Sequence, residues 1–245
     1  MRPGGACYVG IDLSSGGDLT SIALDFDITD MVNTLPIEIP PADTPQPVSY
    51  LYSHSFMPKG RLDEHIKTDF APYDEWANEG LITITGGDSD FKNDYKFIVN
   101  HLREIQEKYD LTFLGIAYDP HNADAFLSDL EEFGAPLLEV KQSARYLNDA
   151  TEDIRLEIKS GRTLHDRRNA LLTWSMANAK TTKNSFGEIK VDKEPTARKK
   201  RIDPVDACID ARTMRIKMPQ GIDAAAEMEK YLERMGWKKT DAEPI

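Results

Sequence analysis

Cysteine and long apolar runs are scarce in this chain of 245 residues. The two cysteines, Cys7 and Cys208, form neither a disulfide framework nor the paired spacing of a zinc site, so we expect a reducing intracellular compartment. No apolar run approaches the roughly 18 residues that a membrane-spanning helix needs. The N-terminus also lacks the apolar core of a signal peptide. These features argue against a disulfide-stapled secreted scaffold and against a membrane protein.

Positive charge is in deficit, with 30 lysines and arginines against 42 aspartates and glutamates and a net charge of -12. This balance argues against a protein that coats nucleic acid by bulk charge. An enzyme that grips a phosphate backbone locally remains possible, because bound divalent cations invert the field of the carboxylates that hold them. Hydrophobic residues at 40% and charged residues at 29% are typical of a globular domain.

The first part of the chain predicts an antiparallel start to a sheet. Tyr8–Leu13 and Thr20–Phe26 are short apolar runs joined by the glycine-rich turn Ser14–Asp18. Val48–Phe56 alternates as a third strand after the proline-rich loop Pro36–Pro47.

Strands and helices then alternate, which favours a parallel continuation of the sheet. Further strands are expected at Leu81–Thr85, Leu111–Tyr118 and Leu137–Val140. Helices are expected at Arg61–Asp69, Pro72–Glu79, Phe91–Tyr109, Ala123–Phe133, Asp149–Ser160, Arg168–Ala179, Asp203–Ile216 and Ala224–Met235. Thr181–Lys193 has no evident packing face and is expected to be a hairpin or mobile loop. The pattern predicts an α/β fold with a mixed central sheet and helices on both faces.

Aspartates stand at the ends of three of these elements. Asp12 ends the first strand, Asp119 ends the Leu111–Tyr118 strand, and Asp203 opens a helix with Asp206 one turn later. Ligand sites of open α/β sheets lie at strand ends, so these side chains are candidates to converge. Carboxylates that meet need cations, and oxygen ligands without cysteine favour Mg²⁺ or Mn²⁺. Two such ions about 3.5–4 Å apart can drive phosphodiester hydrolysis.

Each aspartate also has a structural interpretation. Asp12 and Asp119 could cap turns, and Asp203 before Pro204 is a good helix cap. Asp18 lies in a turn, where aspartate is favoured in any case, so it is a secondary candidate.

Five segments in order resemble the nuclease domain of the large terminase subunit of tailed bacteriophages. They read "GIDLSSGGDLTSIAL", "WANEGLITITGGD", "AYDPHNADAFLSDLEEFGAPLLEVKQS", "IKSGRTLHDRRNALLTWSMANA" and "KKRIDPVDACIDA". The resemblance implies an RNase H-like fold and a metal-dependent endonuclease that cuts concatemeric DNA during genome packaging with two ions. It also implies three essential aspartates, Asp12, Asp119 and Asp203. The family often has an apolar residue at the place of Asp206, which leaves open which of the last pair binds metal directly.

The same resemblance sets expectations about organisation and partners. A full-length large terminase carries an ATPase motor, whose phosphate loop ends in Gly-Lys-Ser/Thr, and nothing in this chain fits that motif. We therefore expect a nuclease domain over residues 1–218, a C-terminal helix and tail over 219–245, and no ATP hydrolysis. Expected partners are double-stranded DNA, an ATPase domain, the small terminase subunit and the portal. The expected location is the host cytoplasm, transiently at the procapsid portal, with the isolated domain monomeric.

Basic residues of the second half are candidates for phosphate contacts. The run Arg198, Lys199, Lys200 and Arg201 immediately precedes Asp203, and Lys183 lies in the Thr181–Lys193 segment. Ordinary solvated surface is the alternative for any one of them. We expect the segment itself to lie near the cleft and to gate or guide DNA. His165 is a secondary candidate to contact a phosphate or orient a water, although a structural histidine fits equally.

Two other functions remain open from the sequence. A phosphotransferase of the actin and sugar-kinase type also begins with a strand carrying aspartate and a Gly/Ser/Thr-rich turn, but it needs a second nucleotide-cradling loop. A non-catalytic module that binds DNA or docks to a portal would keep the basic run and would not need the carboxylates.

Overall fold

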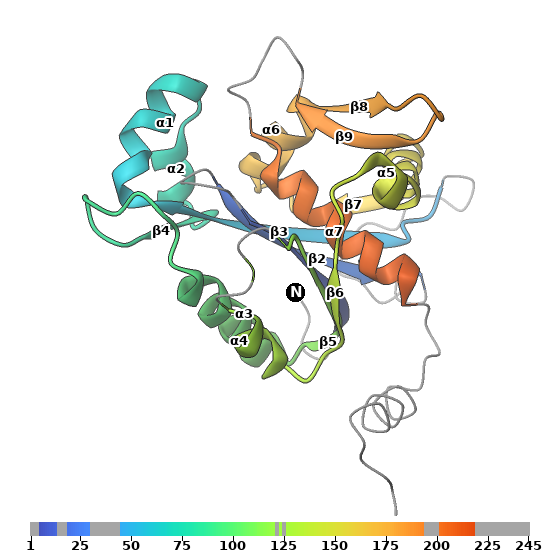
Figure 1. Ribbon diagram of the computed structural model, residues 1–245, viewed down its shortest axis with the longest axis horizontal. Coiled ribbons are helices and arrows are strands. Elements are labelled where there is room, and N and C mark those ends of the chain that lie inside the picture. The colour runs from blue at the N-terminus through green and yellow to red at the C-terminus, as the bar shows by residue number, and fades with distance from the viewer. Residues whose placement is uncertain are drawn as a thin grey trace, which may run out of the picture.

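A mixed seven-stranded sheet forms the centre of the described residues, which are 5–13, 19–29, 45–120, 123, 126–193 and 201–218 of the computed structural model (Figure 1). The strands are β1 (Ala6–Asp12), β2 (Thr20–Asp27), β3 (Ser49–Pro58), β4 (Ile82–Thr85), β5 (Thr112–Tyr118), β6 (Leu137–Glu139) and β7 (Thr163–His165). Their order is β4-β3-β2-β1-β5-β6, and β7 also pairs with β3. β2 is antiparallel to β1 and β3, and the other pairs are parallel, so the predicted mixed sheet with an antiparallel start is confirmed. The sequence did not predict β7, whose three residues are too few to show a period.

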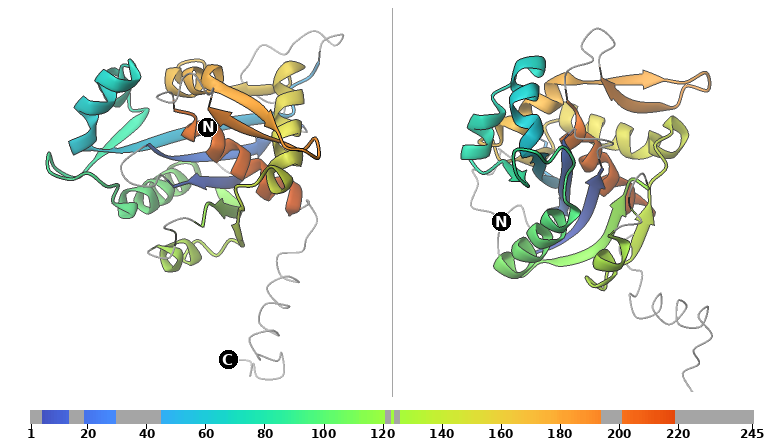
Figure 2. Two further views of the ribbon diagram at one scale, coloured as in Figure 1. Left: turned by 45° about the horizontal axis from the view of Figure 1, so that its top comes forward. Right: turned by 60° about the vertical axis from the view of Figure 1, so that its left-hand side comes forward.

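Helices cover both faces of the sheet, as predicted (Figures 1 and 2). They are α1 (Leu62–Asp69), α2 (Tyr73–Asn78), α3 (Tyr95–Tyr109), α4 (Leu127–Glu131), α5 (Ala144–Lys159), α6 (Ala170–Asn178) and α7 (Asp203–Lys217), with a short 3-10 helix η2 (Lys59–Arg61) before α1. α3 and α4 lie on one face, and α5, α6 and α7 lie on the other. None of the described helices is both long and apolar enough to cross a bilayer.

Side-chain caps set the starts of three helices. Asp94 accepts from a backbone N–H in the first turn of α3, and Ser143 and Asn169 do the same for α5 and α6. The predicted starts at Phe91 and Asp149 are therefore wrong, since the apolar period alone does not locate a cap. The predicted turn Ser14–Asp18, most of the Pro36–Pro47 loop and the Ala224–Met235 helix lie outside the described residues.

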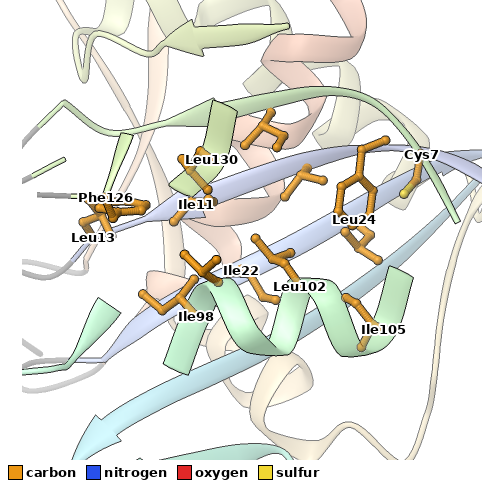
Figure 3. Packing of buried hydrophobic residues seen from close by; sticks show 14 of the residues in the cluster. Cys7, Ile11, Leu13, Ile22, Leu24, Ile98, Leu102, Ile105, Phe126 and Leu130 are labelled. Carbon is orange, nitrogen blue, oxygen red and sulfur yellow. The ribbon is translucent and has the colours of Figure 1, made fainter. Parts of the chain in front are cut away.

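Alternation along β1 divides the core between the two faces of the sheet. Cys7, Val9 and Ile11 pack with α3, where the close-up in Figure 3 shows Ile98 and Leu102 beside the strands. Because successive side chains of a strand point to opposite faces, the residues between them face α7 instead. The last residue of that second set is Asp12, so the strand directs a carboxylate toward α7.

Two glycines let α7 lie almost on the backbone of the sheet. A Cβ atom at Gly10 would stand 2.1 Å from the carbonyl oxygen of Ala207, and one at Gly115 would stand 2.0 Å from Cε of Met214. Both distances are far inside van der Waals contact. A side chain at Gly10 would push the helix backbone away, whereas a side chain at Gly115 would displace the Met214 side chain. Gly10 in β1 therefore fixes how closely α7 crosses this strand, and Gly115 in β5 leaves room for the Met214 side chain.

A buried cluster of ion pairs anchors the C-terminal half of α7. The Arg212 guanidinium is 1% exposed and donates through Nε to Oδ2 of Asp25 on β2 at 2.5 Å. It also pairs with Asp153 and, at 3.0 Å, with Glu157, both on α5. Arg215 extends the cluster to Asp25 at 3.3 Å. Removing one member would leave a buried charge uncompensated, which typically costs about 3–5 kcal/mol, so the cluster holds the helix in one register.

The Thr181–Lys193 segment forms a hairpin, which was one of the two predicted alternatives. Its strands are β8 (Ala179–Lys183), which begins two residues earlier than expected, and β9 (Ile189–Lys193). The expectation that it lacks a packing face is wrong. Ile189 is 6% exposed, its N–H donates to Oδ1 of Asn148 on α5 at 2.9 Å, and Val191 packs against the same apolar cluster as α5 and α7. The hairpin is therefore seated on α5.

We expect Gly10→Ala to destabilise the domain by roughly 1–3 kcal/mol, because the new methyl group meets the α7 backbone rather than a movable side chain. Thermal denaturation measures the effect. Gly87→Ala is the matched control, since a Cβ there meets only Asp90 Oδ2 at 3.7 Å. Equal melting temperatures for the two variants would contradict the close approach of α7.

Candidate active site

Asp12 and Asp119 lie side by side at one edge of the sheet. Asp12 is the last residue of β1, which runs parallel to β5, and the N–H of Asp119 donates to the carbonyl of Ile11 at 3.1 Å. Alternation puts Asp12 on the same face as Gly10, and Gly115 and Ala117 of β5 also face α7. Asp119, two residues beyond Ala117, follows them on that face. The structure thus brings two predicted site residues together through strand pairing alone.

α7 carries three aspartates on the face that meets these strand ends. Asp203, Asp206 and Asp210 are spaced three and four residues apart, which stacks them along one side of a helix. The helix touches Gly10 of β1 through Ala207, next to Asp206. The same contact that seats α7 on the sheet therefore places its acidic side at Asp12.

The carboxylates are close enough to disfavour one another's ionisation. Burial is the main reason that the pKa of Asp12 lies well above its usual range, and the charges of Asp206, Asp203, Asp210 and Asp119 raise it further. Every other acid of the group therefore acts on Asp12, which lies centrally among carboxylates from β1, β5 and α7.

The five aspartates differ in the charges near them and in their exposure to solvent. Burial and the Asp203 charge raise the pKa of Asp206, Lys193 and Lys190 of β9 lower it, and Asp192 between them raises it to a smaller extent. The hairpin thus brings positive charge to this part of the site. Exposure varies as well, because Asp203 is only 6% exposed whereas Asp206, like Asp12 and Asp119, keeps part of its surface open to solvent.

The donor set fits a divalent cation in kind and in charge. All five aspartates offer hard oxygen ligands, which favour Mg²⁺ or Mn²⁺ over thiophilic metals. Oδ2 of Asp210 is buried with no hydrogen-bond partner among the described residues. No three of the described His, Cys, Asp or Glu side chains are already grouped as a complete ligand set.

Arg201 is held within the protein rather than presented to solvent. Its side chain is 12% exposed, and Nε donates to Oδ2 of Asp69 on α1 at 2.9 Å. Nη2 lies 3.0 Å from Nδ1 of His65, and the Arg201 carbonyl accepts from Ser175 of α6 at 3.4 Å. These contacts fasten the residue to α1 and α6 just before Asp203 begins α7. Its geometry therefore favours a positioning role over the DNA contact expected from the sequence.

The other members of that basic run, Arg198, Lys199 and Lys200, lie outside the described residues, as does Asp18. Lys183 is exposed at the far end of β8, where its charge acts on Glu152 of α5. The hairpin lysines whose charges act on Asp206 are Lys190 and Lys193.

His165 does not reach the aspartates. It ends β7, level with Leu51 of β3, whereas Asp12 lies level with Ser55. With strands about 4.8 Å apart and residues about 3.3 Å apart along each strand, the separation is roughly 19 Å. The imidazole Nε2 lies 3.2 Å from the hydroxyl of Thr173, which fits the structural interpretation.

Sequence reasoning missed Asp210 as a member of the acidic group. A signal was present, because Asp210 follows Asp206 by four residues and Asp203 by seven, which is the spacing of a helix face. It also missed Lys193, and there the sequence held no signal, since its place near Asp206 depends on how the hairpin packs on α5.

Comparisons with known proteins give one family match and two relatives that bear on the fold and the family. Residues 1–218 match the family described as "Terminase large subunit, endonuclease domain". The large terminase subunit of Enterobacteria phage HK97 is 31% identical over 188 residues, which are 76% of this chain and 33% of that protein. The crystal structure of the HK97 large terminase superposes with a TM-score of 0.69 at 28% identity, over 87% of this chain and 40% of that one. The chain thus spans about a third of the length of this curated relative.

A second solved structure supports the fold alone. The large terminase nuclease from thermophilic phage G20c superposes with a TM-score of 0.51 at 12% identity, over 86% of this chain and 82% of that one. At this identity the likeness shows the fold alone, which agrees with the expected α/β class with a mixed central sheet.

We expect Asp12→Asn to raise the melting temperature of the metal-free protein at pH 7, because it removes a buried carboxylate on which four other carboxylates act. Each kcal/mol gained corresponds to about 2–4 °C for a protein of this size. A carboxyl whose pKa is raised by folding destabilises the fold above that pKa, and the penalty disappears as the pH falls toward about 3.9. The advantage of the variant should therefore shrink on acidification.

Thermal melts in EDTA at pH 7 and pH 5 measure this difference. Asp63→Asn, an exposed position on α1, is the matched control and should melt like the wild type at both values. A lower melting temperature for Asp12→Asn at pH 7 would show that its carboxylate is stabilised by a partner rather than strained by its neighbours.

Proposed function

This chain belongs to the endonuclease-domain family of terminase large subunits, and we propose that it hydrolyses phosphodiester bonds of double-stranded DNA with divalent metal ions. The observation that carries the proposal is the meeting of Asp12, Asp119 and the acidic face of α7 at one sheet edge. Family membership also disfavours the sugar-kinase alternative, which a shared first-strand motif had left open.

Four residues would hold the ions, namely Asp12, Asp119, Asp203 and Asp206. When bound, Mg²⁺ or Mn²⁺ supplies a Lewis acid for the phosphoryl oxygens and an activated water. The chain contributes the ligands and their placement. Strand pairing sets Asp119 beside Asp12, and the bonds of Arg201 to Asp69 hold the start of α7. No protein nucleophile is required by this scheme.

Positive charge beside an acidic centre suits a polyanionic substrate. Lys190 and Lys193 bring ammonium groups near Asp206, and the hairpin that carries them is seated on α5. We propose that this hairpin guides the DNA backbone to the ions, together with Lys183 and the run Arg198–Arg201, in which Arg201 acts by positioning. Contacts of this kind read phosphates rather than bases, so sequence preference should be weak.

The wider role follows from the relatives. The matched part is 33% of the HK97 large subunit, so we propose that this domain works beside an ATPase domain in a longer assembly. There it would cut concatemeric DNA during packaging, in contact with the small terminase subunit and the portal in the host cytoplasm. Alone, we expect the domain to be monomeric.

We expect Asp119→Asn to lower plasmid nicking in Mn²⁺ by roughly 100-fold or more, because the variant removes a charged ligand and keeps the shape of the side chain. Conversion of supercoiled plasmid to nicked and linear forms measures the rate. Asp63→Asn, on the exposed side of α1, should nick like the wild type. Equal nicking by wild type and Asp119→Asn would remove Asp119 from the site and favour the non-catalytic DNA-binding module.

We expect the pair Lys190→Gln and Lys193→Gln to weaken DNA binding and to reduce the slope of affinity against salt by about 1 for each phosphate that the lysines no longer neutralise. Fluorescence anisotropy of a labelled duplex in Mg²⁺, in the Asp119→Asn background, separates binding from cutting. The control pair, Lys96→Gln and Lys108→Gln, lies on α3 across the sheet and removes the same charge. Identical salt slopes for both pairs would contradict the guiding role.

A further inference from the structure

The acidic face of α7 extends beyond the residues that the proposed nuclease needs. Asp210 lies one turn after Asp206 on the same side of α7 and is 1% exposed. We infer that Asp210 is a fifth ligand-bearing residue of the metal site and that it serves, with Asp119, the ion on the β5 side. This inference rests on the proposed metal-dependent function and assigns residues within it.

The contacts of Asp210 leave half of its carboxylate without a structural partner. Oδ1 accepts from Nε2 of Gln142, just beyond β6, at 3.3 Å. Oδ2 is buried and has no hydrogen-bond partner among the described residues. A buried, half-satisfied carboxylate costs several kcal/mol, and an amide or an apolar side chain would serve packing better at that position. A bound cation is the partner that would offset the cost.

The neighbours of Asp210 place it on one side of the group. Met214, one turn beyond Asp210 on α7, meets Gly115 of β5. Gln142, its hydrogen-bond partner, follows β6, which pairs with β5. Asp203 lies at the opposite end of the acidic face, near Tyr73 of α2. The three aspartates of α7, Asp203, Asp206 and Asp210, therefore form a row that runs from the α2 side, past Asp12, to the β5–β6 side.

The part of α7 from Asp203 to Asp210 is long enough to accommodate a pair of ions. Seven residues of helix separate Asp203 from Asp210, which is about 10.5 Å at 1.5 Å per residue. Two ions about 3.5–4 Å apart, each with a ligand oxygen about 2.1 Å away on its outer side, span about 8 Å. Asp203 and Asp210 can therefore bracket a pair of ions, with Asp12 and Asp206 between them.

Mn²⁺ titration of the metal-free protein tests this assignment without any DNA. Isothermal calorimetry, with electron paramagnetic resonance of unbound Mn²⁺, gives the number of ions and their affinities. Asp210→Asn keeps the size of the side chain and can still accept from Gln142, and Asp210→Ala is a second variant without a buried polar group. Asp119→Asn and Asp203→Asn are the comparison variants, and the exposed Asp63→Asn is the control.

We expect wild type and the control to bind two Mn²⁺ ions. Asp210→Asn and Asp210→Ala should weaken one of the two by about 10–100-fold. Adding Asp119→Asn to Asp210→Asn should affect the same ion, whereas Asp203→Asn should affect the other. The metal-free melting temperature of Asp210→Asn should equal or exceed that of the wild type, which a purely structural role would not give.

Two other outcomes are distinguishable. Unchanged stoichiometry and affinity in a folded Asp210 variant overturn the role of Asp210 and leave the proposed nuclease standing. Failure of the wild type to bind Mn²⁺ overturns both. If Asp210→Asn does not fold, the same readings are taken from Asp210→Ala.

Discussion

The contact of α7 with the backbones of β1 and β5 is the constraint on which the rest of the site depends. Gly10 lets the helix approach β1 to a distance that no side chain would allow, and Gly115 leaves room on β5 for Met214 of the helix. At that distance the acidic side of the helix meets the ends of two parallel strands, where Asp12 is the last residue of β1 and Asp119 follows β5. Packing therefore brings the carboxylates near one another, and burial and mutual repulsion raise the pKa values of Asp12, Asp206 and Asp210.

Ion pairs at both ends of α7 hold the helix in place despite the repulsion between the site carboxylates. The buried Arg212 cluster joins the C-terminal half of α7 to β2 and α5. Arg201, which lies just before α7, joins the start of this helix to α1 and α6. Each anchor joins an arginine to a carboxylate outside the site, so the site aspartates remain available for cations. A fold that separates its structural ion pairs from its functional acids in this way can tolerate a concentration of negative charge at one edge.

Much of this architecture follows from local sequence signals. Apolar runs ending in Asp12 and Asp119 predicted the two central strands, and the helix beginning at Asp203 was predicted at its observed start. Properties that depend on packing between distant segments were not predictable. The sequence does not show that Arg201 turns toward Asp69, or that β9 lies on α5 and brings Lys193 to Asp206. Asp210 is an intermediate case, because its helical spacing was visible and its burial was not.

Crystallography with Mn²⁺ is the most direct test of whether acids from β1, β5 and α7 jointly hold metal ions. The account predicts two anomalous peaks about 3.5–4 Å apart at the ends of β1 and β5, with Asp12 oxygens in contact with both. Peaks only on the outer surface, or an Asp12 carboxylate turned away from any ion at saturating Mn²⁺, would contradict it.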